Sequence, residues 1–111
     1  MAISWDDFEK IDMRIGTIIG VNDFPKARKP AYQLTIDFGE GIGIKKSSAQ
    51  ITAHYKKEEL LNRQVIAVVN FPAKQIADFI SECLVLGVYD ENNDVILLYP
   101  EKFVSNGNKI G

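Results

Sequence analysis

The stretch "MRIGTIIGV" (Met13–Val21) indicates the fold more directly than any other part of the sequence. Its alternation predicts a strand with one face made of Met13, Ile15, Thr17, Ile19 and Val21. The opposite face contains Gly16 and Gly20. Glycines placed in this way let a strand coil sharply, as a small barrel requires. The stretch therefore predicts the first strand of a small β-barrel.

The segments on either side extend this pattern. Before the strand, Ser4 and Asp7 are spaced as a capping box, which predicts a short helix within residues 1–11. After it, "AYQLTIDFG" (Ala31–Gly39) alternates and directs Tyr32, Leu34, Ile36 and Phe38 inward. "GEGIG" then predicts a turn into a third strand, on which simple alternation places Lys46 on the buried face. Either a bulge therefore intervenes or the strand has reached the rim of the barrel.

The second half of the chain predicts a short helix at "KKEELL" and strands at "VIAVVN", "CLVLGVY" and "VILLY", the last two joined as a hairpin around "DENND". These strands are apolar on both faces, so the terminal segments, a second subunit or both must cover the outer face. Five or six strands with a helix between the third and fourth predict an all-β protein with short helices. The expected fold is a five-stranded Greek-key barrel of the OB type with an N-terminal helical extension.

Length and composition indicate one domain. The chain has 111 residues, of which 46% are hydrophobic and 25% charged. No apolar run is long enough to span a membrane, and the N-terminus lacks the pattern of a signal peptide. Cys83 is the only cysteine, which agrees with a reducing cytoplasm. We therefore expect a single cytoplasmic domain over residues 1–111.

Charge is unevenly distributed along the chain. Residues 26–74 carry nine basic and four acidic side chains, whereas the segments before and after them are acidic. "IKKSSAQITAHYKKEELLN" (Ile44–Asn62) lies in this basic segment. We predict that it forms the rim of the barrel, here called the basic lip. Two interpretations remain open, a surface that faces an anion or ordinary solvated loops.

The residues give little support for catalysis. One histidine, His54, and one cysteine, Cys83, show no metal-ligand spacing, and no nucleophile motif surrounds the cysteine. No carboxylate partner is evident for His54, so a surface or structural role is expected. We predict no enzyme activity, no metal and no cofactor.

Several linked motifs resemble the tRNA-binding domain family: "DFEKIDMRIGTI", "FPKARKPAYQLTIDFG", "SSAQITAHYKKEELLNRQVIAVVNF" and "SECLVLG". Within that family, "IGIKKSSAQIT", "VIAVVNFP" and "NGNKIG" are most similar to the export-related CsaA-type chaperones. The resemblance implies an OB-fold homodimer in the cytoplasm that assists preproteins destined for export, with the export machinery as a further partner and tRNA as a second ligand.

The resemblance also implies an RNA face, comprising Lys45, Lys46, Ser48, Tyr55, Asn70, Lys74 and Ser81. Two positions depart from the family pattern, because Ala49 and Asp78 stand where glycine is common. The added negative charge of Asp78 should weaken phosphate binding nearby.

Two functions stay open at this stage. A chaperone needs an apolar groove, for which the expected lining residues are Phe24, Phe71, Ile76 and Phe79, in segments read as loops. The same residues could instead pack the loops onto the barrel. The alternative is a structure-specific tRNA-binding protein that uses the basic lip. Lysines and loop aromatics alternate along the chain, which favours separate sites.

The ends of the chain carry more apolar side chains than one small barrel can bury. The predicted dimer interface consists of Ile3, Trp5, Phe8, Phe103, Val104 and Ile110, within residues 1–11 and 100–111.

Overall fold

The computed structural model describes residues 1–111, with two short helices and nine strands. The helices are α1 (Trp5–Glu9) and α2 (Lys57–Leu60). The strands are β1 (Met13–Asp23), β2 (Tyr32–Asp37), β3 (Ile44–Ala49), β4 (Gln64–Val68), β5 (Lys74–Ile76), β6 (Phe79–Ser81), β7 (Leu84–Val85), β8 (Gly87–Tyr89) and β9 (Val95–Leu97). The expected five or six strands were too few, because "FPAKQIADFISE" forms the hairpin β5–β6 and "CLVLGVY" is divided into β7 and β8.

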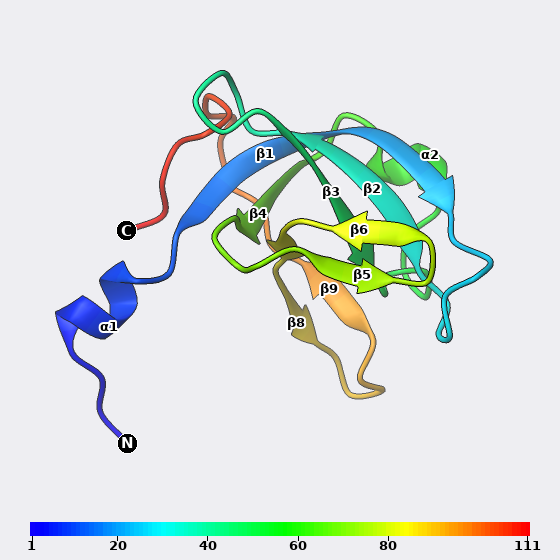
Figure 1. The fold of residues 1–111 in the computed structure, drawn as a ribbon, viewed down its shortest axis with the longest axis horizontal. Helices are drawn as coiled ribbons and strands as arrows, with labels where there is room; N and C mark the ends of the chain where they lie inside the picture. The colour runs from blue at the N-terminus through cyan, green and yellow to red at the C-terminus, as the bar shows by residue number, and fades with distance from the viewer.

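Five strands form one antiparallel sheet in the order β3-β2-β1-β4-β7, which curls into a nearly closed barrel (Figure 1). Its two edges meet where Ser47 Oγ donates to the carbonyl of Cys83 at 2.9 Å and Glu82 N–H donates to the carbonyl of Lys46 at 2.7 Å. This arrangement confirms the predicted all-β barrel of the OB type.

The first strand has the predicted position but the opposite phase over its first half. Gly16 and Ile18 face the barrel interior, whereas Ile19 is 44% exposed. A bulge between Ile18 and Gly20 shifts the register, so that Val21 packs against the core again. Simple alternation cannot detect such a bulge, because the extra residue changes the face of every side chain after it.

Gly16 is required by the space inside the barrel. A Cβ atom at this position would lie 2.6 Å from Ile36 Cγ2 and 2.7 Å from the ring of Phe38. The glycine therefore allows β1 and β2 to coil tightly around the core.

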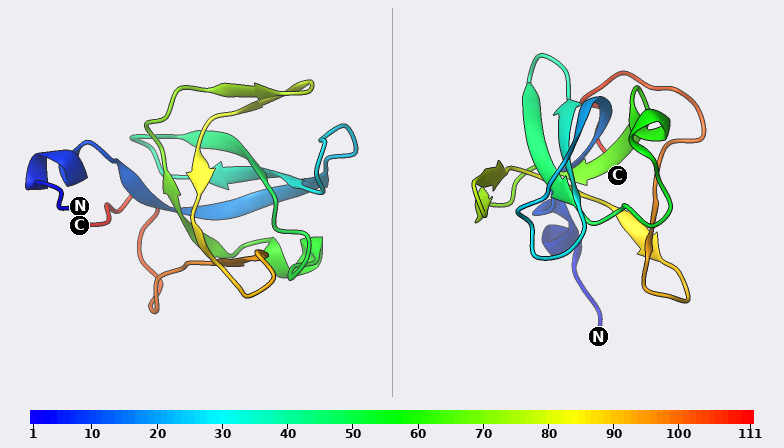
Figure 2. Two further views of the ribbon diagram at one scale, coloured as in Figure 1. Left: turned by 90° about the horizontal axis from the view of Figure 1, so that it is seen from below. Right: turned by 90° about the vertical axis from the view of Figure 1, so that its right-hand side faces the viewer.

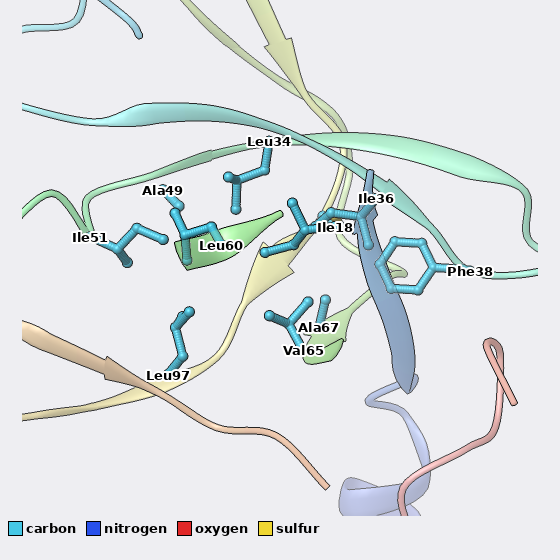
Figure 3. Close-up of a cluster of buried hydrophobic side chains, with 11 residues drawn as sticks. Ile18, Leu34, Ile36, Phe38, Ala49, Ile51, Leu60, Val65, Ala67 and Leu97 are labelled. Atoms are coloured by element: carbon cyan, nitrogen blue, oxygen red, sulfur yellow. The ribbon is translucent and has the colours of Figure 1, made fainter. Parts of the chain in front are cut away.

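The main core is a cluster of 11 buried residues that extends from Ile51 and Leu60 to Phe38 (Figure 3). As predicted, β2 contributes Leu34 and Ile36 to it. The third strand corrects the prediction for Lys46, which is exposed, whereas Ser47 is buried and Ile44 is exposed. The turn before β3 sets this phase, and the alternation of Ile42 and Ile44 did not reveal it.

The C-terminal segment lies along β1 and reaches the outer side of β4. Its backbone pairs with β1 through Ile15 N–H to the carbonyl of Asn108 at 3.0 Å and Gly107 N–H to the carbonyl of Ile15 at 2.7 Å. Gln64 Nε2 donates to the carbonyl of Val104 at 2.7 Å. These contacts account for the burial of Ile15 and Gln64 on the outer side of the sheet, whereas Ile19 remains exposed.

The predicted N-terminal helix is present as α1, capped by Ser4 and Asp7 in a capping box. The Ser4 backbone N–H and hydroxyl both bond with Asp7 and hold the pKa of its carboxyl below the usual value. The helix lies beside the C-terminus at one end of the barrel and buries no residue (Figure 2).

Candidate functional site

Two adjoining hollows lie beside the end of β3 and the hairpin β5–β6. One of them also borders the hairpin β8–β9, and the other borders the loop after β1. The first, the apolar groove, has a volume of about 520 Å³, and nine of its fifteen lining residues are hydrophobic. It is lined by Ser48, Ala49, Gln50, Ile51, Phe71, Pro72, Lys74, Ile76, Ser81, Cys83, Leu84, Val85, Tyr89, Asn93 and Val95.

The second hollow, the basic basin, has a volume of about 950 Å³. It is lined by Lys26, Ala27, Arg28, Lys29, Ala31, Ser48, Gln50, Lys74, Gln75, Ile76 and Ala77. The groove and the basin share Ser48, Gln50, Lys74 and Ile76. Segments far apart in the sequence therefore meet in one continuous surface, although the sequence favoured separate sites.

The hairpin β5–β6 divides the two hollows, and a small second core holds it in place. Phe79 of β6 packs on Phe24, with ring centroids 5.4 Å apart, and Ala31 completes the buried cluster. Ala77 closes the turn of this hairpin with a left-handed φ of +54°.

Asp78 also holds the hairpin β5–β6 in place, through an ion pair. Its carboxylate lies 2.9 Å from Lys26 Nζ, which holds the pKa of Asp78 below its usual value. The loop after β1 and the tip of β5–β6 are thus joined by apolar packing and by one exposed ion pair.

The hairpin β8–β9 forms the other wall of the groove, to which it contributes Tyr89, Asn93 and Val95. Asp90 Oδ1 accepts from the backbone N–H groups of Asn92 and Asp94, both at 2.9 Å, which shapes the turn. His54 Nε2 lies 2.7 Å from Asp90 Oδ2. His54 thus has a carboxylate partner, contrary to the expectation from the sequence. The sequence did not reveal it because Asp90 lies 36 residues further along the chain.

The bonds from Asp94, His54 and Asn92 keep the pKa of Asp90 below its usual value. Ligand atoms of His54, Asp90 and Asp94 lie within 4.8 Å of one another, a grouping of potential metal ligands that the sequence did not predict. The carboxylate oxygens of Asp90 already bond with the backbone of the turn and with His54, and these bonds explain why the three side chains lie together.

Only some of the predicted RNA-face residues line the two hollows. Ser48 and Lys74 lie in both hollows and Ser81 lines the groove, where its Oγ accepts from Ser48 N–H at 3.1 Å. Lys45 and Lys46 lie on β3 and line neither hollow.

Tyr55 and Asn70 form intramolecular contacts instead. The Tyr55 hydroxyl accepts from Leu97 N–H at 2.9 Å, and the ring lies 5.3 Å from the guanidinium carbon of Arg63. Asn70 bonds with the carbonyl of Lys10 and the N–H of Asp12, at 2.7 and 3.0 Å. Both side chains connect segments of the fold and do not line either hollow.

The predicted peptide-binding residues are also divided. Phe71 is 55% exposed and lines the apolar groove together with Ile76. Phe24 and Phe79 are buried against each other, so they cannot line it as predicted. Ile76 and Phe79 belong to strands and not to loops, because the short hairpin β5–β6 escaped the strand pattern.

Sequence reasoning missed several lining residues. Arg28 and Lys29 face the basin, and Leu84, Val85 and Val95 face the groove. The run "KARK" in the loop after β1 was a usable signal for the basin. No comparable signal marked the groove walls, because apolar strand residues are normally assigned to the core.

The two hollows have a distinct electrostatic character. No aspartate or glutamate lines either of them. Lys26 is paired with Asp78, but Arg28, Lys29 and Lys74 take part in no ion pair. The surface is therefore suited to a ligand that combines apolar parts with negative charge.

Cys83 lies at the floor of the groove and is buried, and burial raises the pKa of its thiol to about 11. Such a thiol is a poor nucleophile near neutral pH.

Comparisons with known proteins agree with this architecture. Residues 13–109 match the family model of the tRNA binding domain. The chain belongs to the tRNA-binding domain family. This result confirms the resemblance found in the sequence.

Two solved structures are similar over the whole chain. The CsaA chaperone protein from Picrophilus torridus is 56% identical, with a TM-score of 0.93, over 99% of this chain and 100% of that one. The chaperone CsaA from Bacillus anthracis is 49% identical, with a TM-score of 0.94, over all of both chains.

Among curated proteins, the methionine–tRNA ligase of Pyrococcus abyssi is 38% identical over 110 residues, which are 99% of this chain. The chain spans only 15% of the length of that enzyme. The match therefore concerns one small part of the ligase.

The two helices are short, and neither is long and apolar enough to cross a membrane.

Proposed function

We propose that this protein is a CsaA-like, export-related chaperone that binds unfolded or preprotein segments in the apolar groove. The observation that carries the proposal is the groove itself, an open hollow in which nine of fifteen lining residues are hydrophobic. Phe71 and Leu84 remain 55% and 48% exposed there. Exposed apolar surface of this kind gains free energy when a flexible apolar segment covers it.

The relatives support this function. Two structures described as CsaA chaperones share the fold at 49% and 56% identity. We propose that the partners are preproteins and the export machinery, and that the protein acts in the cytoplasm as a binding domain without catalytic activity.

Phe71→Ala tests the groove. We expect the affinity for an unfolded apolar peptide, measured by fluorescence anisotropy, to fall about tenfold or more, as at a buried aromatic contact of an interface. Suppression of aggregation of a denatured test protein should fall in parallel. Tyr99→Ala is the matched control, since Tyr99 is exposed and lines neither the groove nor the basin. Equal affinities of the two variants would contradict the proposal.

A second function, binding of tRNA, is favoured by the basic basin. Arg28, Lys29 and Lys74 provide cations without intramolecular partners, and Ser48 and Ser81 provide hydroxyl groups beside them. Lys45 and Lys46 could add phosphate contacts from β3. We expect tRNA affinity to fall steeply with salt and each lost phosphate contact to lower the slope by roughly 0.7 to 0.9. The affinity for an apolar peptide should change little as the salt concentration increases.

Lys74→Ala examines this second function, because Lys74 lies in both hollows. A variant with unchanged tRNA affinity and salt slope would remove Lys74 from the phosphate contacts.

We also propose a homodimer formed by the terminal segments. Ile3, Trp5 and Phe103 are exposed by 67%, 78% and 81%, and Phe8, Val104 and Ile110 are half-buried. Ile3, Trp5 and Phe8 line a hollow of about 380 Å³ beside Gly111. A second copy that inserts its own terminal side chains would cover this surface.

A further inference from the structure

The apolar groove and the basic basin share one wall, and we infer that their preferred occupant is an extended segment with acidic residues next to its apolar run. This inference rests on the proposed peptide-binding function and specifies the class of segment bound. The shared wall consists of Ser48, Gln50, Lys74 and Ile76. A chain that leaves the groove across this wall enters the basin.

Apolar side chains of the occupant have one place to bind. Phe71 and Leu84 are exposed on the walls of the groove, and Val85 and Val95 complete its lining. Lys74 is the only charged residue among the fifteen that line it. The groove therefore stabilises an apolar run and discriminates little between charges within its own length.

The residues that follow the apolar run meet a different surface. The basin contains Lys26, Arg28, Lys29 and Lys74 and no carboxylate. The pair between Lys26 and Asp78, at 2.9 Å, neutralises only Lys26. Aspartates or glutamates of the occupant would find three unpaired cations here, whereas lysines or arginines would meet charges of their own sign.

The size of this preference is modest. Exposed ion pairs contribute little individually, so two or three of them should change affinity by about threefold to tenfold at low salt. The preference should disappear as salt screens the basin. This dependence on salt separates the flanking charges from the apolar contacts.

Fluorescence anisotropy with the full chain tests the inference. Four short labelled peptides share one apolar run and differ in the flanking residues: serine at both ends, glutamate at the N-terminal end, glutamate at the C-terminal end, or lysine at both ends. We expect one of the glutamate peptides to bind about tenfold more tightly than the lysine peptide at low salt. Equal affinities of all four peptides would overturn the inference.

Substitution of the basin provides an independent readout. The double variant Arg28→Gln, Lys29→Gln should lose most of the advantage of the glutamate peptide and keep the affinity for the serine peptide, because both residues line the basin and neither lines the groove. Lys102→Gln is the control, because Lys102 is exposed, forms no ion pair and lines neither hollow. A double variant that retains the full glutamate advantage would overturn the inference. The salt dependence of the unaltered protein tests the same point without any substitution.

The peptide series also separates this inference from the proposed function. Failure of all four peptides to bind would reject the groove as a peptide site, and the inference with it. Binding of the serine peptide without any effect of flanking charge would reject the inference alone. Transfer RNA serves as a competitor: displacement of the glutamate peptide at lower RNA concentrations than the serine peptide supports the shared basin. If tRNA bound but displaced neither peptide, the basin would be excluded as a site shared by tRNA and peptide.

Discussion

The barrel core and the terminal segments are both rich in apolar side chains, yet only the core buries them. Ile18, Leu34 and Leu60 are fully buried, whereas Trp5 and Phe103 remain 78% and 81% exposed. No buried side-chain polar atom in this structure lacks a hydrogen-bond partner. The buried region specifies the fold, whereas the exposed terminal side chains form the surface at which we propose association.

The largest expected effect distinguishes two adjacent leucines. Leu60 is fully buried and Leu61 is 48% exposed. Leu60→Ala should lower the free energy of unfolding by about 2 to 5 kcal/mol, since it removes buried methyl groups and leaves a cavity. Leu61→Ala, the control, should change it by less than about 1 kcal/mol. Urea unfolding of both variants measures the difference, and equal losses would mean that the core does not extend to α2 as described.

The next effect comes from overfilling the core. Gly16→Ala would place a methyl group 2.6 Å from Ile36 Cγ2, and we expect a loss of about 1 to 3 kcal/mol in the free energy of unfolding. Gly41→Ala is the matched control, because nothing lies within 4 Å of a Cβ atom there. An unaffected midpoint for Gly16→Ala would show that β1 can move away from β2 without cost.

Substitutions in the terminal segments should affect self-association and not the stability of the monomer. Trp5→Ala combined with Phe103→Ala should leave monomer unfolding almost unchanged but weaken self-association at least tenfold, or about 1.4 kcal/mol. Sedimentation equilibrium at several concentrations measures this change. Tyr99→Ala, with another exposed aromatic residue, should leave the association unaffected. If the double variant instead destabilised the monomer, the terminal side chains would belong to the core.

The smallest effect concerns the exposed hairpin that forms one wall of the groove. The pKa of Asp90 lies below its ordinary value of 3.8 because of the backbone N–H of Asp94 and the ring of His54. The ionised carboxylate therefore contributes stability above the ordinary value, and this contribution is lost as the pH falls through the lowered pKa. Asp90→Asn should lower the unfolding midpoint slightly near neutral pH, where the carboxylate is ionised, and should flatten the pH dependence of the midpoint below about pH 4.

Asp94→Asn serves as the comparison for this last prediction, since Asp94 offers its backbone N–H to the turn and retains it after substitution. An identical acid response of Asp90→Asn and the unaltered protein would show that the turn does not depend on the charge of Asp90.

The sequence predicted the parts of this protein that depend on local patterns. Alternation in "AYQLTIDFG" correctly directed Leu34, Ile36 and Phe38 inward, and the spacing of Ser4 and Asp7 gave the capped helix. Linked motifs identified the family, and matching of residues 13–109 confirmed it. These features lie within a few residues of one another or follow a fixed period, so they can be read directly.

Tertiary structure decided the remaining features. A bulge after Ile18 returned Val21 to the core side, and burial of Phe24 against Phe79 removed both from the expected groove. The contact of His54 with Asp90 and the wall shared by groove and basin join segments that lie tens of residues apart. No local pattern contains these relations, because they arise only when the barrel closes and brings its two hairpins to the end of β3.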